Sequence, residues 1–151
     1  MRPLLVGELN PYGADPYYAL FCLPPGSAGG RMQRLVCRLH QTTYLKLDRV
    51  NLCEGRWRDE LAAAHATRIL SSAEDRAIFL LGRKVADAFG FRGRLFTSSL
   101  IGDGRRGVLA YLPHPSGRCR VWNDPESFIS ARHVLASLCP EIPWGELSAA
   151  S

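Results

Sequence analysis

Three neutral side chains that can form hydrogen bonds, Asn10, Asn51 and His114, stand at or just beyond the ends of short apolar runs. An amide carries both a donor and an acceptor, and a neutral imidazole carries one of each. Together they suit recognition of a planar polar group such as a nucleobase, or the positioning of a water molecule. No Ser or Cys nucleophile in a known motif, no metal-ligand spacing and no G-x-G-x-x-G loop accompanies them.

Each of these residues also has an ordinary structural role to set against the chemical one. An Asn before proline is a common turn residue, an Asn can end a strand, and a His can cap a loop. Function is favoured for His114, because Pro-Ser-Gly-Arg follows it directly. The pairing of Asn10 with the His114 loop favours function there too, whereas the two interpretations of Asn51 have equal weight.

Apolar runs alternate with helical patterns along the chain, and this predicts the elements that position these side chains. An α/β fold is expected, a three-layer α/β/α domain over residues 1–151 with a central, mostly parallel four-stranded sheet. In such a sheet, ligands bind just beyond the carboxyl ends of the strands. The predicted strands are 4–6, 45–52, 77–81 and 107–112, with 95–97 as an edge strand or loop; the predicted helices are 29–40, 59–70 with Asp59 as its cap, 83–89, and a last one after Pro125 that reaches Leu138.

Length and composition exclude several classes of protein. The 151 residues are 46% hydrophobic and 22% charged, as in one globular domain with a core of its own. No apolar run approaches the ~20 residues of a membrane helix, and the first one is too short for a signal peptide. The five cysteines include no C-x-x-C pair, which indicates free thiols rather than a zinc site. We therefore expect a soluble, cytoplasmic protein without a membrane partner.

The charge of the chain permits a polyanionic partner without requiring one. The formal net charge is +5, and Lys46 and Lys84 are the only lysines among the 19 basic residues. Arginine binds phosphate as a planar fork, so this bias suits nucleic acid. A GC-rich coding sequence explains the bias equally well.

The residues after the first and last predicted strands resemble the two motifs of the uracil-DNA glycosylase superfamily. Asn10-Pro11-Tyr12 is similar to its first motif, and His114-Pro115-Ser116-Gly117-Arg118 is similar to its second. Leu20-Phe21, an Asn near the end of the second strand and Leu80-Leu81-Gly82 follow in the same order, so the resemblance spans residues 3 to about 138. It implies a monomer that hydrolyses the N-glycosidic bond of uracil in single- or double-stranded DNA for base excision repair. It implies no metal or cofactor, and a base flipped out of the stack.

The resemblance also implies roles for individual side chains. His114 would donate a hydrogen bond to the uracil oxygen that becomes negative, and Asn10 would position the attacking water. Asn51 would read the O4 and N3–H edge of uracil and reject cytosine. Phe21 would stack on the base, and Tyr12 would block the space that thymine's methyl group needs. Ser116, Arg118 and Arg120 would contact phosphates or fill the position that the base leaves.

The first motif departs from the family pattern, because Glu8 and Leu9 separate Gly7 from Asn10 where one residue is usual. Either the turn bulges, or Glu8 takes the water-activating position and Asn10 moves away. Three alternatives stay open: the same fold acting on another deaminated base or a nucleoside, a non-catalytic module that binds uracil-containing or single-stranded DNA, and an unrelated Rossmann-like nucleotide-binding domain. The last of these lacks a glycine-rich phosphate loop and an acidic residue placed for a ribose.

Overall fold

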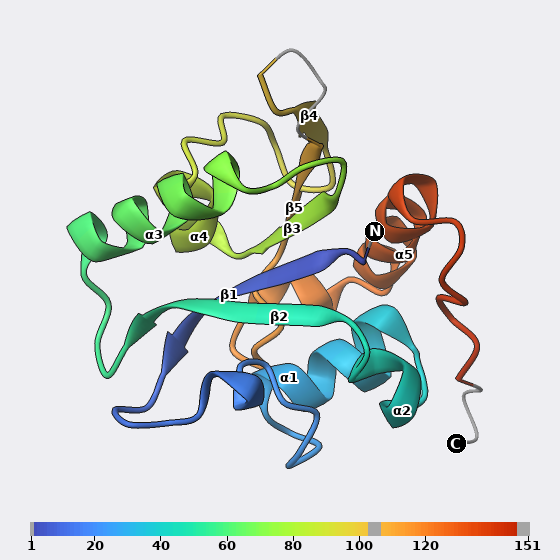
Figure 1. The fold of residues 1–151 in the computed structure, drawn as a ribbon. Coiled ribbons are helices and arrows are strands. Elements are labelled where there is room, and N and C mark those ends of the chain that lie inside the picture. Colours follow the sequence, from blue (N-terminus) through green and yellow to red (C-terminus); the bar gives the residue numbers. More distant parts are fainter. Residues whose placement is uncertain (1, 103–106, 148–151) are drawn as a thin grey trace.

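The computed structural model describes residues 2–102 and 107–147 and contains one sheet of five strands (Figure 1). The strand order is β2-β1-β3-β5-β4, and β4, at one edge, runs antiparallel to its neighbour while the other pairs are parallel. The predicted α/β fold with a mostly parallel central sheet is confirmed, with five strands in place of four. The strands are β1 (Leu4–Asn10), β2 (Asp48–Glu54), β3 (Ala77–Leu81), β4 (Ser98–Leu100) and β5 (Val108–Leu112).

Helices cover both faces of this sheet and make the three layers (Figure 1). One face is covered by α3 (Asp59–Ser71) and α4 (Arg83–Ala88). The opposite face is covered by α1 (Ala28–Arg31), a π-helical turn η2 (Met32–Cys37), α2 (Gln41–Tyr44) and α5 (Glu126–Leu138). Two 3-10 turns, η1 (Pro16–Tyr18) and η3 (Arg120–Asn123), lie in the connections.

The central strand β3 shows why the apolar runs are continuous. All of its residues are buried, and they alternate between two cores. Ile78 and Leu80 pack with α3 and α4, whereas Phe79 and Leu81 pack with the helices of the opposite face. A parallel strand with both faces covered has no solvent side, so it needs no polar residue in alternate positions.

The strand order reverses at β1, which places a ligand site at its end. The chain passes from β1 to β2 on one side, and β3 then adds on the other side of β1. In open α/β sheets, ligands bind outside the carboxyl ends of the strands at such a reversal. The carboxyl end of β1 carries Glu8 and Asn10, so the topology alone assigns these two residues to the candidate site.

The first strand is longer than predicted. It was expected to end before Gly7, but β1 continues to Asn10. Leu4 lies opposite Asp48 of β2, and Asn10 lies opposite Glu54, so the register against β2 is the same at both ends of β1. The extra residue of the first motif therefore lengthens the strand and produces no bulge. β2 also begins and ends later than the predicted 45–52.

The predicted helix 29–40 is present but ends earlier, at Cys37, and it consists of an α-helical turn followed by a π-helical turn. This turn ends where Arg38 adopts a left-handed conformation, with φ 50°. The buried Gln33 side chain donates to the carbonyl of Leu39, at 2.6 Å, and so satisfies a backbone acceptor beyond the end. The apolar spacing of the segment is that of an α-helix and gave no sign of the wider π-helical turn.

Smaller differences concern element boundaries. The edge strand lies at 98–100 rather than 95–97, and residues 103–106 of the weak segment 91–106 lie outside the described residues. Arg58 is the N-cap residue of α3, so the prediction that Asp59 caps this helix is wrong. Asp59 instead lies in the first turn, where its carboxylate accepts a hydrogen bond from the Trp57 indole at 2.7 Å.

The described part of the chain carries few features that suggest a membrane, disulfide or metal role. None of its helices is long and apolar enough to cross a membrane. The five cysteines are unpaired. Within the same ranges, no three His, Cys, Asp or Glu side chains gather as a metal site would need.

Candidate functional site

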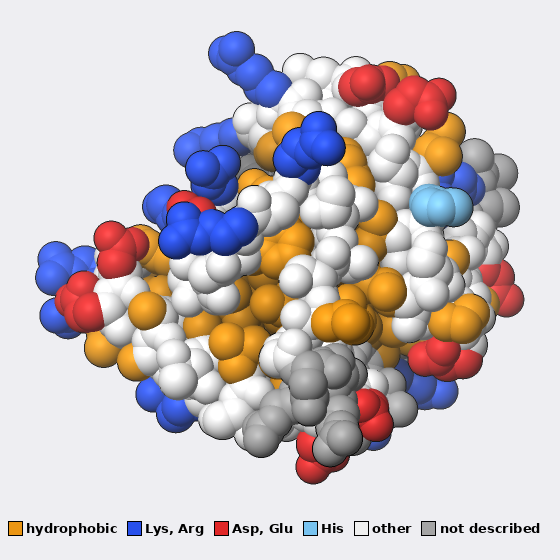
Figure 2. Space-filling model, turned by 90° about the horizontal axis from the view of Figure 1, so that it is seen from above, with side chains coloured by type: hydrophobic (Ala, Val, Ile, Leu, Met, Phe, Trp, Pro, Cys, Tyr) orange, Lys and Arg blue, Asp and Glu red, His pale blue; other side chains and the backbone are white. Residues whose placement is uncertain are grey.

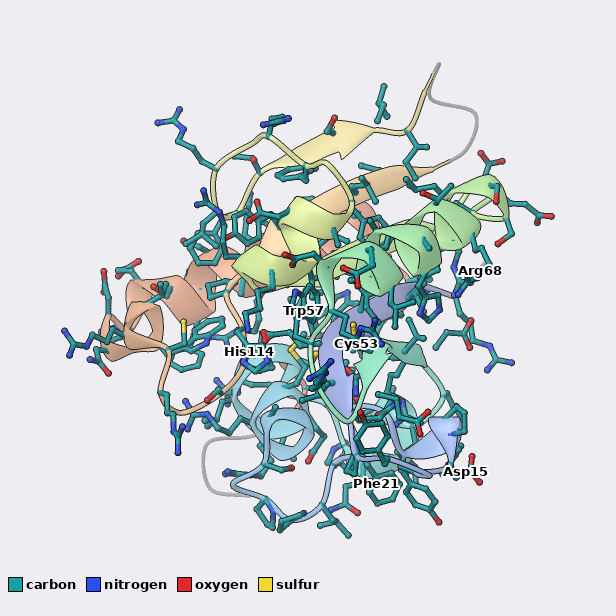
Figure 3. All side chains as sticks on the ribbon, turned by 90° about the vertical axis from the view of Figure 1, so that its left-hand side faces the viewer. Asp15, Phe21, Cys53, Trp57, Arg68 and His114 are labelled. Atoms are coloured by element: carbon teal, nitrogen blue, oxygen red, sulfur yellow. The ribbon has the colours of Figure 1, made fainter. Side chains whose placement is uncertain are left out.

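A cavity of about 500 Å³ opens at the carboxyl ends of β1 and β2, beside the loop that follows β5. Figure 3 views the sheet from this edge and shows His114 on the loop after β5 and Phe21 on the segment after β1. A volume of this size is typical of small-molecule sites. The lining residues are Glu8, Leu9, Asn10, Pro11, Tyr18, Leu20, Phe21, Leu23, Ser27, Ala28, Gly29, Asn51 and His114.

The His114 ring is held so that one nitrogen remains free. Its Nδ1 atom lies 3.1 Å from the backbone N–H of Ser116 and must accept from that donor. The backbone carbonyl of His114 accepts from the Trp122 indole at 2.7 Å. In the neutral ring the proton therefore sits on Nε2, since Nδ1 is the acceptor. The cavity is thus lined by a histidine whose Nε2–H is available to a ligand.

The surroundings of His114 favour its neutral form. Burial lowers the pKa of His114 below its ordinary value of 6.5, the Glu8 carboxylate opposes this by raising it, and Lys84 lowers it further. The Glu8 Oε2 atom lies 3.9 Å from His114 Nε2, which is too long for a hydrogen bond. At neutral pH the imidazole is therefore an uncharged donor beside a carboxylate.

We expect an NMR titration of the His114 ring to give a pKa below 6.5 in the wild type. Glu8→Gln removes a negative charge that stabilises the imidazolium, so the pKa should fall further. Lys84→Met removes a positive charge that destabilises it, so the pKa should rise. Shifts in the opposite directions would contradict this account of the site, and the exposed His133 serves as the internal reference.

The two asparagines of the site bind each other. Asn51 Nδ2 donates to Asn10 Oδ1 at 2.7 Å and to the carbonyl of Leu9 at 3.2 Å. Asn51 is only 9% exposed, and its Oδ1 atom has no hydrogen-bond partner among the described residues. Both amide hydrogens of Asn51 are therefore used within the protein, while one acceptor is left unpaired. This arrangement fixes Asn10 and leaves Asn51 no free N–H with which to read a base.

Gly7 makes room for this pair, because it lies opposite Asn51 in the parallel register. A Cβ atom at Gly7 would overlap Asn51 Oδ1 and press on the Leu20 side chain. We expect Gly7→Ala to destabilise the fold by about 1–3 kcal/mol, as overpacking of a full interior does. A thermal melt measures this loss. Gly26→Ala is the control, since a Cβ there meets nothing within 4 Å, and equal melting of the two variants would contradict the prediction.

The long first motif predicted either a bulged turn or a shift of Asn10 away from the site. The structure contains no bulge. Glu8 and Asn10 are two residues apart in an unbroken strand, so they share one face. Both line the cavity. Glu8 does not displace Asn10, and the site holds a carboxylate and an amide side by side.

The aromatic residues divide between the cavity and the surface. Phe21 lines the cavity, as its predicted role requires. Tyr12 does not line it: this side chain is 74% exposed, and its ring lies against Gly55, where a Cβ would overlap it. Tyr18 lines the cavity instead. Sequence reasoning missed Tyr18, and the turn-forming Asp15-Pro16 pair before it was the available signal.

The predicted DNA-binding residues lie beside the cavity without lining it. Ser116 Oγ accepts from the backbone N–H of Arg118 at 3.1 Å and so shapes the turn after His114. The side chains of Arg118 and Arg120 are exposed. Arg31, which the sequence did not single out, donates from Nε to the carbonyl of Pro115 at 2.8 Å. It ties the His114 loop to the helix on the far side of the cavity.

A second hollow, of about 670 Å³, lies beside the start of α4, which follows the carboxyl end of β3. Arg83, Arg92 and Arg94 line it, together with Asp87, which pairs with Arg83 at 3.3 Å. In Figure 2, which looks onto the side of α4 and β4, Lys and Arg side chains gather toward the carboxyl ends of the strands. The edge that carries the cavity thus also carries positive charge.

Comparison with known proteins adds no assignment to this geometry. No model of a protein family matches the chain, and no curated protein matches it. The cavity therefore has to be interpreted from its own chemistry: a neutral imidazole donor, a carboxylate, a fixed amide and an aromatic wall.

Proposed function

We propose that this chain is a cytoplasmic, monomeric DNA glycosylase, similar to uracil-DNA glycosylases, that hydrolyses the N-glycosidic bond of uracil or a related deaminated base. One observation carries the proposal. A single cavity at the strand ends brings together Glu8, Asn10, Phe21 and His114, the last with a free Nε2–H. These residues come from β1, from the segment after β1 and from the loop after β5, and all of them line the same cavity.

His114 suits the stabilisation of a departing pyrimidine anion. When the glycosidic bond breaks, negative charge develops on a carbonyl oxygen of the base. A neutral imidazole donor that is already oriented stabilises this charge without reorganisation. The Ser116 N–H bond fixes the ring, and burial keeps it uncharged.

Glu8 suits the other half of the reaction. A carboxylate can accept a proton from water, which an amide cannot, and its charge favours the positive sugar of an oxocarbenium-like transition state. Asn10 is fixed by Asn51 at the same wall of the cavity. We infer that Asn10 orients the water and that Glu8 receives its proton.

Phe21 accounts for binding of the base itself. The Phe21 ring forms an apolar wall on which a flat base can stack. The Oδ1 atom of Asn51 is buried and lies where a Cβ atom on Gly7 would overlap it, so it is not open to the base. Asn51 therefore serves to hold Asn10 in place.

The arginine-lined hollow supports nucleic acid as the substrate. Arg92 and Arg94 are exposed, and neither forms an ion pair with another described residue. Phosphate contacts of this kind position a strand without reading its sequence. The proposal therefore includes a DNA backbone that crosses the strand ends from the cavity toward α4.

The direct test is a base-release assay on single-stranded oligonucleotides that carry one uracil, hypoxanthine or thymine. Abasic sites are detected by alkali cleavage. Cleavage at uracil, lost in Glu8→Gln, supports the proposal, whereas cleavage only at hypoxanthine changes the substrate and keeps the reaction. Absence of cleavage at every base contradicts a glycosylase.

A second candidate is a non-catalytic module that binds uracil-containing or single-stranded DNA. The hydrogen bond that Asn10 Oδ1 accepts from Asn51 favours it, because this oxygen is already occupied when no ligand is present. The module predicts salt-sensitive binding of the same oligonucleotides with every base retained. Binding and base release measured on one sample separate the two functions.

A further inference from the structure

Exposed apolar side chains concentrate around the mouth of the cavity. Among the described residues, most of the large apolar side chains left in solvent belong to the segment 9–23: Leu9, Tyr12, Tyr17, Tyr18 and Leu23. Tyr17 is 52% exposed and Tyr18 is 55% exposed. Leu9, Tyr18 and Leu23 also line the cavity, so exposed apolar side chains adjoin the candidate site, and clustered apolar surface is typical of binding sites.

Three of the rings in this segment form a compact cluster at the cavity. Phe21 and Tyr18 line the cavity, and their ring centroids are 4.9 Å apart. The Tyr17 ring lies 5.1 Å from that of Tyr18 and 6.0 Å from that of Phe21, and it does not line the cavity. The cluster therefore joins the cavity wall to the outer surface beside it.

Two neighbouring side chains hold this cluster of rings in place. The Asp15 carboxylate accepts from the backbone N–H of Tyr17 at 2.9 Å and caps the turn η1. The Arg49 guanidinium lies 5.3 Å from the centre of the Tyr17 ring and donates to the carbonyl of Ala19 at 3.0 Å. Rings that are already ordered lose little entropy when a ligand covers them.

We propose that Tyr17 and Tyr18 form a stacking platform for the unpaired base next to the one in the cavity, so that single-stranded DNA is the preferred substrate. This rests on the proposed function, because it takes the cavity as the site of the target base. Aromatic rings beside positive charge are how proteins bind single strands without sequence preference. A neighbouring base that is paired in a duplex cannot leave its stack to use the platform.

The kinetic test compares uracil release from a single strand and from the matching duplex. The wild type is expected to favour the single strand by about tenfold, from ~1–3 kcal/mol per stacked base. Y17A, which removes the ring that does not line the cavity, should lose most of this preference by slowing the single strand only. Y17F keeps the ring and should retain the preference, and Ile129→Ala, which shortens an exposed apolar side chain on α5, is the surface control.

A binding test gives a result that does not depend on catalysis. The affinity for a single-stranded uracil oligonucleotide is compared with that for the same strand carrying abasic analogues on both sides of the uracil. We expect about tenfold weaker binding of the abasic strand by the wild type and no difference in Y17A/Y18A. Base-dependent binding without any base release keeps the platform and overturns the glycosylase. Base release with equal affinity for both strands keeps the glycosylase, leaves the rings to a protein partner and overturns the platform.

Discussion

Replacing His114 by alanine should slow uracil release by about 10²–10³-fold while DNA affinity changes only a few-fold. In the proposed reaction, the imidazole contacts the leaving base at the point where negative charge appears only in the transition state. An interaction of that kind contributes to turnover and little to substrate binding. Single-turnover kinetics measures the first quantity, and fluorescence anisotropy with a labelled oligonucleotide measures the second.

The control for this variant is His133→Ala, which removes an exposed histidine from α5. It should leave both rate and affinity unchanged. Because His114 Nδ1 and its carbonyl are both hydrogen-bonded, a melting curve of His114→Ala must show that the loop is still folded. An unchanged rate would remove His114 from the mechanism. Equal losses of rate and affinity would give it a binding role only.

The fold was predictable because its strands carry a strong signal. The strand 77–81 was predicted with its final boundaries, since burial on both faces requires an uninterrupted apolar run. The end of β1 was not predictable from hydrophobicity. Glu8 and Asn10 are polar, and what keeps them in the strand is pairing with β2, more than forty residues away.

The candidate site was predictable in its positions and not in its contacts. Asn10, Asn51 and His114 were found because each follows an apolar run, and parallel strands bring such ends together. The hydrogen bond between Asn51 and Asn10 depends on the register of β1 against β2 and on the space at Gly7. Tyr12 turned outward because Gly55 offers its ring a flat surface, a contact between distant segments.

That hydrogen bond leads to the second large effect, a non-additive pair of variants. Asn10→Ala and Asn51→Ala should each slow uracil release by about 10²-fold, which is typical of a misplaced catalytic group. The double variant should be no slower than the slower single variant. If Asn51 acts by holding Asn10, then removing Asn10 leaves it nothing further to hold.

The opposite result has an equally definite meaning. If Asn51 reads the base independently of Asn10, the two losses in the rate of uracil release multiply to about 10⁴-fold in the double variant. The ratio of cytosine release to uracil release should then also be higher for Asn51→Ala than for the wild type. Melting curves are needed for each variant, because Asn51→Ala removes the hydrogen bonds that Asn51 donates to Asn10 and to the Leu9 carbonyl, at about 0.5–1.5 kcal/mol each. Asn123→Ala, on the exposed turn η3, is the matched control for loss of an asparagine. A multiplied loss with stable folds would restore Asn51 to the role of base reader and require Asn10 to release it when the substrate enters.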